Sequence, residues 1–276
     1  MSETRVKPDP AKAEPQTSKS TAVANLALFY KNPQPLSAQL HGHWRLREGN
    51  VGFAADTAYI PVTLSEFALV VRDYPLLFAQ STAAPLALLG LERQNLFVSD
   101  GMWEDHAYIP AYVRRYPFST IRLEDDKGFA MVVDTESERL VKDPACEDGV
   151  ALFDLDEPSS FTRQVMDYCE AFHREALATQ AFSEALKAQD ILVDRRADLT
   201  LPDGKILGID GFCIVDAERF SKLDDHVIVD WHRKGWLGLI SFHLASLERF
   251  SNLMKRNSAR RQTLSEPITN AKSKKG

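Results

Sequence analysis

The segment from Tyr108 to Phe118 has the most unusual composition in the chain. Four aromatic residues and the pair Arg114 and Arg115 lie within its eleven positions. An arginine side chain can stack on an aromatic ring, and its planar guanidinium can bind a carboxylate through two hydrogen bonds. We therefore interpret this segment as a contact surface for a peptide or protein partner that bears a carboxylate. The candidate binding residues in and just before it are Trp103, Tyr108, Tyr112, Arg114, Arg115 and Tyr116.

A structural interpretation of the same segment is also open. Aromatic and β-branched residues around Pro110 are typical of a packed edge strand, because proline has no backbone N–H to donate to a neighbouring strand. In that case Arg114 or Arg115 would pair with the acidic stretch that follows.

Asp230 and His232 form a second candidate site on either side of Trp231. Residues two apart in a strand point to the same face, so a strand here would bring the carboxylate beside the imidazole. A carboxylate in that position can orient a histidine base. The alternative is an ordinary strand end before the turn at Gly235.

His41 and His43 would also share one face of a strand, as two imidazole ligands of a metal ion do. The spacing supplies no third ligand, so we favour no metal and retain these two histidines as weak candidates. Cys169 and His173 lie one helical turn apart and could form a thiolate–imidazole pair. Cys169 also lies on the apolar face of its predicted helix, which favours a role as a small core residue.

The chain lacks the short motifs of common nucleophile, nucleotide and zinc sites. It contains no GxSxG, GxGxxG, P-loop or HExxH sequence, and its three cysteines form no CxxC pair. We therefore predict no cofactor, assign no catalytic residue and favour binding over catalysis.

The composition is that of an ordinary globular protein. The 276 residues have a formal net charge of −6, with 44% hydrophobic and 26% charged residues, which excludes collagen-like and wholly disordered chains. Twelve acidic and three basic residues lie between Glu124 and Glu157, and such a surface repels phosphates, so no nucleic-acid partner is predicted. No run of about 18 apolar residues is present, so no transmembrane segment is expected.

The chain is expected to have three parts. Residues 1–25 are polar, contain prolines and include no aromatic residue, which predicts a disordered N-terminal tail. They show no secretory pattern, so we expect a cytoplasmic location, with surface association only through signal-independent export. Residues 26–255 are predicted to form one domain, and the basic residues 256–276 a disordered C-terminal tail.

The first half of the domain is predicted to be mostly β, with one capped helix. Thr63 and Glu66 have the spacing of a capping box, and the helix that they begin should stop before Pro75. Strands are expected near 41–46, 59–62, 76–79, 85–89 and 108–113, followed by a hairpin with Gly128 in the left-handed conformation.

The second half is predicted to contain a helical pair, a β-hairpin and a long C-terminal helix. The expected elements are helices at 159–178 and 179–189, a hairpin around residues 202–204, a brief strand at 227–229 and a last helix at 237–254. Because strands and helices do not alternate strictly along the chain, the predicted fold class is α+β.

A set of segments along the chain resembles the bacterial SapC family. The segments are residues 30–36, 60–62, 66–67, 73–75, 88–91, 95–97, Trp103, 108–118, 152–154, 211–212 with Asp216, and 246–247. The resemblance covers about residues 26–254. The glycine that is usual in the family after Phe153-Asp154 is absent, and Asp156-Glu157 stands there.

The resemblance implies an accessory role rather than a defined activity. The family takes its name from a protein associated with a paracrystalline surface layer. Many relatives are encoded near outer-membrane uptake receptors and flavin-dependent halogenase-like proteins, which implies support of an uptake or modification system. We therefore expect an interaction protein that binds a peptide or protein partner. The alternative is a cytoplasmic enzyme or ligand-binding protein acting on a peptide or amino-acid-derived substrate, with one pocket formed by His41, His43, Arg114, Arg115, Asp230 and His232.

Overall fold

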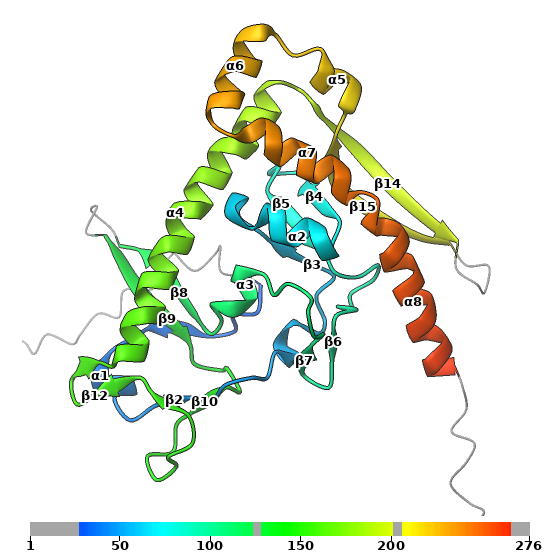
Figure 1. The fold of residues 1–276 in the computed structure, drawn as a ribbon. Coiled ribbons are helices and arrows are strands. Elements are labelled where there is room, and N and C mark those ends of the chain that lie inside the picture. Colours follow the sequence, from blue (N-terminus) through cyan, green and yellow to red (C-terminus); the bar gives the residue numbers. More distant parts are fainter. Residues whose placement is uncertain (1–27, 124–127, 201–205, 266–276) are drawn as a thin grey trace, which may run out of the picture.

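The computed structural model describes residues 28–123, 128–200 and 206–265 (Figure 1). Its helices and antiparallel sheets confirm the predicted α+β class. The strands are β1 (Pro33–Pro35), β2 (Arg45–Leu46), β3 (Tyr59–Pro61), β4 (Leu76–Ala79), β5 (Pro85–Leu88), β6 (Val98–Ser99), β7 (Met102–Trp103), β8 (Phe118–Arg122), β9 (Phe129–Asp134), β10 (Leu140–Val141), β11 (Val150–Ala151), β12 (Phe153–Asp154), β13 (Glu157–Pro158), β14 (Leu192–Thr200) and β15 (Ile206–Val215). The helices are α1 (Ala38–His41), α2 (Phe67–Asp73), α3 (Ala111–Arg114), α4 (Ser160–Ala188), α5 (Ala217–Ser221), α6 (Asp225–Arg233), α7 (Trp236–Ser246) and α8 (Arg249–Ser265).

The largest sheet has the strand order β14-β15-β4-β5-β3, and all its strand pairs are antiparallel. Leu76 and Phe78 of β4 are fully buried in the main core. Helices α2, α4 and α7 contribute Phe67, Phe182 and Ile240 to the same core. Each such side chain contributes roughly 1.5–3 kcal/mol to stability through burial. This packing fixes the long helix α4 beside the sheet.

A second, smaller core packs against the N-terminal half of α4. It joins Phe118 of β8, Val133 of β9, Leu152 and Cys169. Strands β8 and β9 belong to a three-stranded sheet with the order β1-β9-β8. The lower end of α4 is therefore anchored to a different sheet from its upper end, as Figure 1 shows.

Strand β1 forms one edge of this three-stranded sheet. Leu36 N donates to Met131 O, and Thr135 N donates to Asn32 O, so the even-numbered positions of β1 face β9. Pro33 and Pro35 therefore occupy the positions that face away from β9.

The predicted capping box is confirmed. Thr63 and Glu66 make both reciprocal hydrogen bonds at the start of a 3-10 turn, Leu64–Glu66, which leads directly into α2. Helix α2 ends at Asp73, two residues before Pro75, as proline requires. The predicted strands at 76–79 and 85–89 are also present, as β4 and β5.

Helix α4 runs without a break through the position where two helices were predicted. Thr179, expected to cap the second helix, lies inside α4. Its hydroxyl donates to Glu175 O at 2.7 Å and accepts from Leu64 N at 3.1 Å. A threonine whose hydroxyl bonds back to the preceding turn does not end a helix, and tertiary contact with Leu64 stabilises it there.

Two predicted strands are helical instead. Residues 227–229 belong to α6, and residues 108–113 form a short loop followed by α3, with Pro110 as the residue before the helix. Proline is tolerated at a helix start because the N–H that it lacks has no intrahelical partner there. The pattern of aromatic and β-branched residues was thus a sign of burial rather than of extension.

The C-terminal helix is divided into α7 and α8. Ser246 at the end of α7 donates its hydroxyl to His243 O and accepts from Leu76 N, so it bonds across to β4 at the point where the first helix ends. The hairpin residues 202–204 lie outside the described residues. Gly128 has the predicted left-handed conformation, with φ of +92°.

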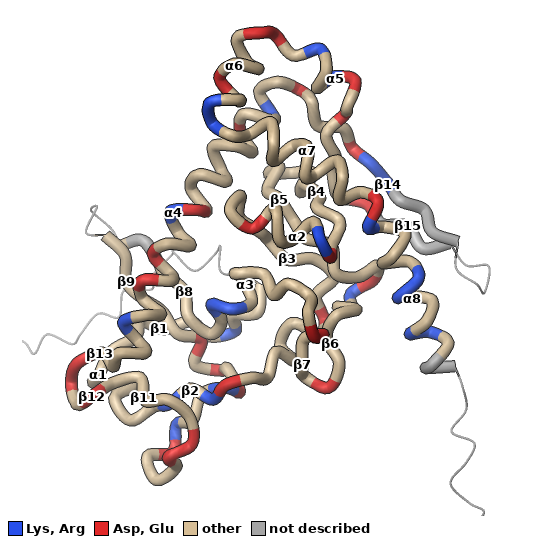
Figure 2. Tube along the Cα trace, viewed as in Figure 1, with Lys and Arg blue, Asp and Glu red and all other residues tan. Residues whose placement is uncertain are grey.

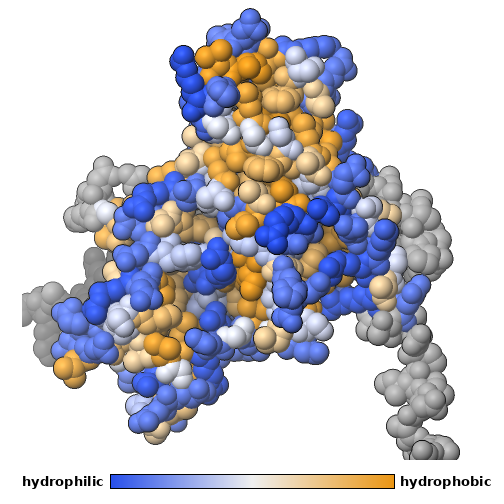
Figure 3. Space-filling model, viewed as in Figure 1, coloured by the Kyte–Doolittle hydropathy of each residue, from blue (hydrophilic) through white to orange (hydrophobic). Residues whose placement is uncertain are grey.

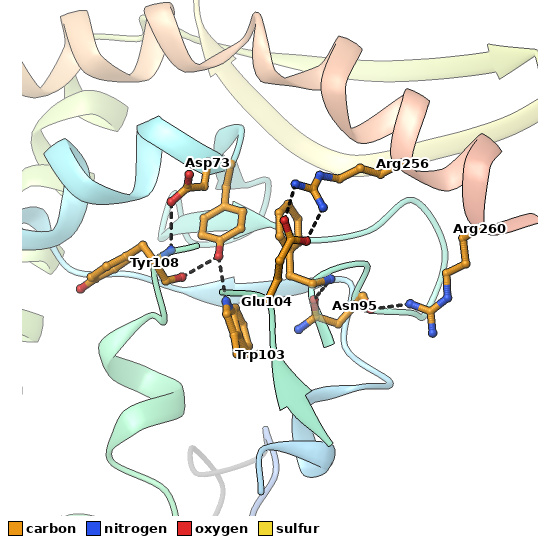
Figure 4. Close-up of polar contacts among 9 residues, drawn as sticks. Asp73, Asn95, Trp103, Glu104, Tyr108, Arg256 and Arg260 are labelled. Atoms are coloured by element: carbon orange, nitrogen blue, oxygen red, sulfur yellow. Dashed lines mark hydrogen bonds and ion pairs between the residues drawn. The ribbon is translucent and has the colours of Figure 1, made fainter. Parts of the chain in front are cut away.

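Helix α8 extends to Ser265, so residues 256–265 are helical and not a disordered tail. Arg256 forms a two-pronged ion pair with Glu104 and lies over the ring of Phe97 (Figure 4). Arg260 donates to Asn95 O at 3.1 Å. The basic residues of α8, blue in Figure 2, therefore dock this helix onto the 95–104 segment. Residues 1–25 and 266–276 lie outside the described residues.

Apolar side chains are exposed over the helices at the top of the molecule. Figure 3 shows an apolar area over α6 and α7. Val229 and Phe242 in these helices are 49% and 41% exposed.

His243 joins α7 to the central sheet. Its Nε2 accepts from Val215 N at 3.0 Å, and its Nδ1 lies 2.8 Å from Leu76 O. The neutral ring with its proton on Nδ1 therefore hydrogen-bonds to both β15 and β4. The ring is fully buried and lies against Phe78. Burial lowers the pKa of His243 from 6.5 to about 4, despite the opposing hydrogen bond to Leu76.

We expect His243 to make the fold sensitive to acid. Because its pKa is lower in the folded chain than in the unfolded one, the unfolded state binds a proton first as the pH falls. The stabilisation is complete above pH 6.5 and is lost as the pH falls from 6.5 toward 4. The loss between pH 7.5 and 5 should be on the order of 2 kcal/mol.

Urea unfolding of wild type and His243→Gln at these two pH values tests this expectation. The variant should be less stable at pH 7.5 but lose less stability on acidification. His226→Gln, at an exposed position, should retain the wild-type dependence. An equal acid loss in wild type and His243→Gln would show that other groups cause it.

Candidate functional site

A hydrogen bond to Glu66 fixes the position of the first residue of α3. The Glu66 carboxylate is buried and accepts four hydrogen bonds. Oε2 accepts from the backbone N and the hydroxyl of Thr63, at 2.8 and 2.9 Å. Oε1 accepts from Ala111 N at 2.6 Å and from Tyr108 Oη at 3.0 Å. One side chain thus caps its own helix and binds the first residue of α3.

Tyr108 and Arg114 are ordered by the same carboxylate. Arg114 donates through Nη2 to Tyr108 Oη at 3.1 Å and through Nε to Ile109 O at 3.0 Å. Its guanidinium also lies over the rings of Tyr108 and Tyr168. Burial raises the pKa of Tyr108 to about 12, and Glu66 adds to the effect, so its hydroxyl remains a donor.

A cavity of about 330 Å³ opens beside α3, between α4 and the small sheet that contains β2. Three arginines line it: Arg114 and Arg115 at the end of α3, and Arg139 just before β10. We call this cavity the arginine pocket. Figure 2 shows basic positions at the end of α3 and beside β2. Its other lining residues are Leu46, Glu48, Tyr116, Phe118, Val150, Phe161, Gln164, Val165 and Tyr168.

Arg115 is held by aromatic rings. Its guanidinium carbon lies 4.2 Å from the ring centre of Tyr112 and 4.3 Å from that of Phe172. Its Nε is buried and has no hydrogen-bond partner among the described residues. Contact with two rings holds the guanidinium in place, and among the described residues its donors form no ion pair with a carboxylate.

Arg139 lines the pocket from the side of β10. It donates through Nη1 to Tyr116 O at 2.8 Å and through Nε to Arg47 O at 3.3 Å. Burial lowers the pKa of Arg139, although Tyr116 and Glu48 oppose the shift. Among the described residues the Arg139 guanidinium bonds to neutral carbonyls, and an anionic partner is strongly stabilising beside such a partly buried cation.

The pocket has an excess of positive charge. Its three arginines face one lining carboxylate, Glu48. In the described part of the chain, none of the three has an ion pair within 4.0 Å. The acidic stretch was expected as a partner for Arg114 or Arg115, but its described residues form no ion pair with either arginine. Arg139, by contrast, escaped the sequence analysis, although it is one of three basic residues in that stretch.

The aromatic candidates are largely structural. Trp103 is buried, and its Nε1 donates to Tyr74 Oη at 3.1 Å, which in turn donates to Tyr108 O (Figure 4). Tyr112 is 7% exposed. Tyr116 is buried and donates to Asp134 Oδ2 at 2.8 Å. Of these three rings, Tyr112 supports Arg115 directly, whereas Trp103 and Tyr116 bond to other residues.

Asp230 and His232 do not share a face. Both lie on α6, where residues two apart are separated by about 200° around the axis. Asp230 is exposed and pairs with Lys234 at 2.7 Å, one turn along, while Trp231 is buried against Trp236. The prediction of a strand with a paired acid and base is therefore wrong.

His41 and His43 do not lie on a strand either. His41 ends α1 and is buried, with Nδ1 accepting from Ser37 N and the ring edge-on to Trp44. His43 lies in the following turn and is exposed. Among the described residues, no three His, Cys, Asp or Glu side chains are grouped as metal ligands.

The structure separates the residues that one enzymatic pocket would need. Helices α1 and α6 lie at opposite ends of the molecule (Figure 1), and α3 lies between them. Arg114 and Arg115 line the arginine pocket, whereas His232 of α6 and His41 and His43 near α1 do not.

Cys169 and His173 have different surroundings. Cys169 is buried in the second core, and burial raises its thiol pKa to about 11, against the opposing effect of Arg115. The His173 ring instead stacks on Phe129, with 4.1 Å between ring centres.

A family model described as SapC matches residues 36–253, which is most of the chain. The chain belongs to the SapC family. No curated protein and no solved structure gives a significant match. Within the described residues, no helix has the length and apolarity needed to cross a membrane.

The turn that departs from the family resemblance lies between β12 and β13. Leu155 there has φ of +57° and is almost fully exposed. Glycine would adopt this left-handed conformation without the steric cost that Leu155 has.

Glu66→Gln should be strongly destabilising. An amide offers one acceptor oxygen where the carboxylate offers two, so its NH₂ group would face two donors in either orientation. We expect a loss of about 3 kcal/mol in the free energy of unfolding, measured with urea. Glu170→Gln removes only an exposed pair with Arg174 and should cost much less. Equal losses in the two variants would contradict a central role for Glu66.

Proposed function

We propose that this SapC-family chain is an accessory binding protein, not an enzyme, and that its arginine pocket binds a carboxylate of a peptide or protein partner. The observation that supports the proposal is the convergence of three arginines on one cavity of about 330 Å³. That volume lies at the small end of the range for ligand pockets, which suits one terminal residue or one acidic side chain.

The chemistry of the pocket favours a carboxylate. A guanidinium presents paired donors that match the two oxygens of a carboxylate, and such bonds are strongest where water is displaced. Arg115 lies against two aromatic rings and Arg139 is fixed by backbone carbonyls, so little side-chain freedom remains to be lost on binding.

Apolar residues complete the pocket. Val150, Phe161 and Val165 line it together with the arginines. A carboxylate next to an apolar group, as at the end of a peptide, fits this combination. The family name suggests a component of a surface layer as that partner, and the proteins encoded near relatives suggest a component of an outer-membrane uptake or modification system.

Short peptides test the pocket directly. The probes are acetyl-Ala-Ala-Phe with a free C-terminal carboxylate, the same peptide with a C-terminal amide, and acetyl-Ala-Asp-Phe-amide, which offers an acidic side chain. NMR titration of wild type should show saturable binding of one or both carboxylate peptides, weakened by salt. The first and third peptides distinguish a terminal from a side-chain carboxylate.

Arg139→Gln and Arg115→Gln should each weaken this binding by about tenfold or more. The matched control is Arg163→Gln, an exposed arginine on α4 that bonds to Pro158 O and does not line the pocket. It should bind as wild type does. Binding of the amide as tightly as the acid, or no binding of either carboxylate peptide, would refute the proposed function.

We expect the protein to act in the cytoplasm. The support is that Cys146, Cys169 and Cys213 are all free thiols, which is usual in a reducing compartment. Fractionation with protease treatment of intact cells should find the protein protected in the cytosol. Cleavage from outside would contradict this location and favour the surface-layer role.

A further inference from the structure

A second cavity lies higher on α4, apart from the arginine pocket. Its volume is about 490 Å³, and it opens to the surface between α4, the edge strand β3 and the β4–β5 turn. Ala176, Thr179 and Ser183 of α4 line it at helical spacing, so they lie on one face of the helix. We call it the α4 cavity.

The lower wall of the α4 cavity is the aromatic group that supports Arg115. Tyr112 and Phe172 line the α4 cavity, whereas Arg115, which lies against both rings, lines the arginine pocket. The two cavities are therefore successive along α4 and have different chemistry. Val62 and Pro85 add apolar surface to the α4 cavity from the sheet side.

Ser183 is the unusual polar group of this cavity. The residue is 97% buried, and its hydroxyl has no hydrogen-bond partner among the described residues. Two other hydroxyls within helices do have one: Thr179 donates to Glu175 O and Ser241 to Leu237 O, each four residues back. An unpaired buried hydroxyl is costly, and rotation about its Cα–Cβ bond can turn it toward a ligand.

The charges around the α4 cavity are balanced. Glu184 and Lys187 are its two charged lining residues. Each is already bonded: Glu184 accepts from Gln180 Nε2 at 2.8 Å, and Lys187 donates to Ser81 O. The cavity therefore has no excess charge with which to attract an ion, unlike the arginine pocket.

From these observations we propose that the α4 cavity is a binding site for a neutral small molecule with an apolar, ring-sized body and one hydroxyl or carbonyl group. The body contacts Val62, Pro85 and Phe172, and the polar group bonds to the Ser183 hydroxyl. A mostly apolar cavity with a few placed polar groups is the usual form of such sites. This site does not depend on the proposed carboxylate partner.

The test uses 2-naphthol, a neutral two-ring molecule with one hydroxyl, and the full chain. Saturation-transfer NMR should detect saturable binding to wild type. Ala176→Leu fills the cavity from α4 and should weaken binding by about tenfold or more. Ala178→Leu makes the same change at an exposed position of the same helix and should have no effect.

Ser183→Ala separates the hydroxyl from the shape of the cavity. It should weaken 2-naphthol binding while leaving the melting temperature unchanged or raised, because the hydroxyl has no internal partner to lose. If Ala176→Leu does not fold, Ala84→Leu fills the cavity from the opposite wall.

Arg139→Gln should bind 2-naphthol as wild type does, which distinguishes this site from the arginine pocket. No saturable binding to wild type, or equal binding by the variants that fill the cavity, would overturn the proposal.

Discussion

A buried carboxylate is stable only when hydrogen-bond donors surround it. The donors to the Glu66 carboxylate come from parts of the chain that are far apart in sequence. Two of its four donors belong to Thr63, and the others belong to Tyr108 and Ala111. Removing any of them would leave the buried charge with fewer donors and less stabilised. The position of α3, and so of both its arginines, follows from this requirement.

The same arrangement explains why the arginines are well ordered although they lie at the end of a four-residue helix. So short a helix has little stability of its own. Its position is fixed from outside: by Glu66 at its first residue, and by the rings of Tyr112 and Phe172, which both contact Arg115. Stability of the core and geometry of the pocket are therefore inseparable in this part of the molecule.

Local sequence signals predicted local structure well. The capping box of Thr63 and Glu66, the stop before Pro75 and the left-handed Gly128 all depend on near neighbours, and all are present. The signals failed where distant contacts decide. Apolar spacing at 227–229 suits a strand or a helix, and only the packing of Trp231 selects α6.

The candidate site shows the same division. Arg114 and Arg115 were identified because they are adjacent and surrounded by aromatic residues. Arg139 was missed because no local pattern shows that it will approach them from β10's side of the fold. The sequence predicts the tyrosines to form a contact surface, but Tyr112 and Tyr116 are buried. Aromatic rings that stabilise cations also pack well in a protein interior. Sequence alone did not distinguish the two uses.

The prolines of β1 have a consequence for the behaviour of the protein at high concentration. The positions that face away from β9 are Pro33 and Pro35, so the outer side of this strand presents carbonyl oxygens but no N–H donors there. A strand from another molecule would find no matching ladder to extend. This edge of the sheet is thereby protected against edge-to-edge association, the first step toward amyloid-like aggregation.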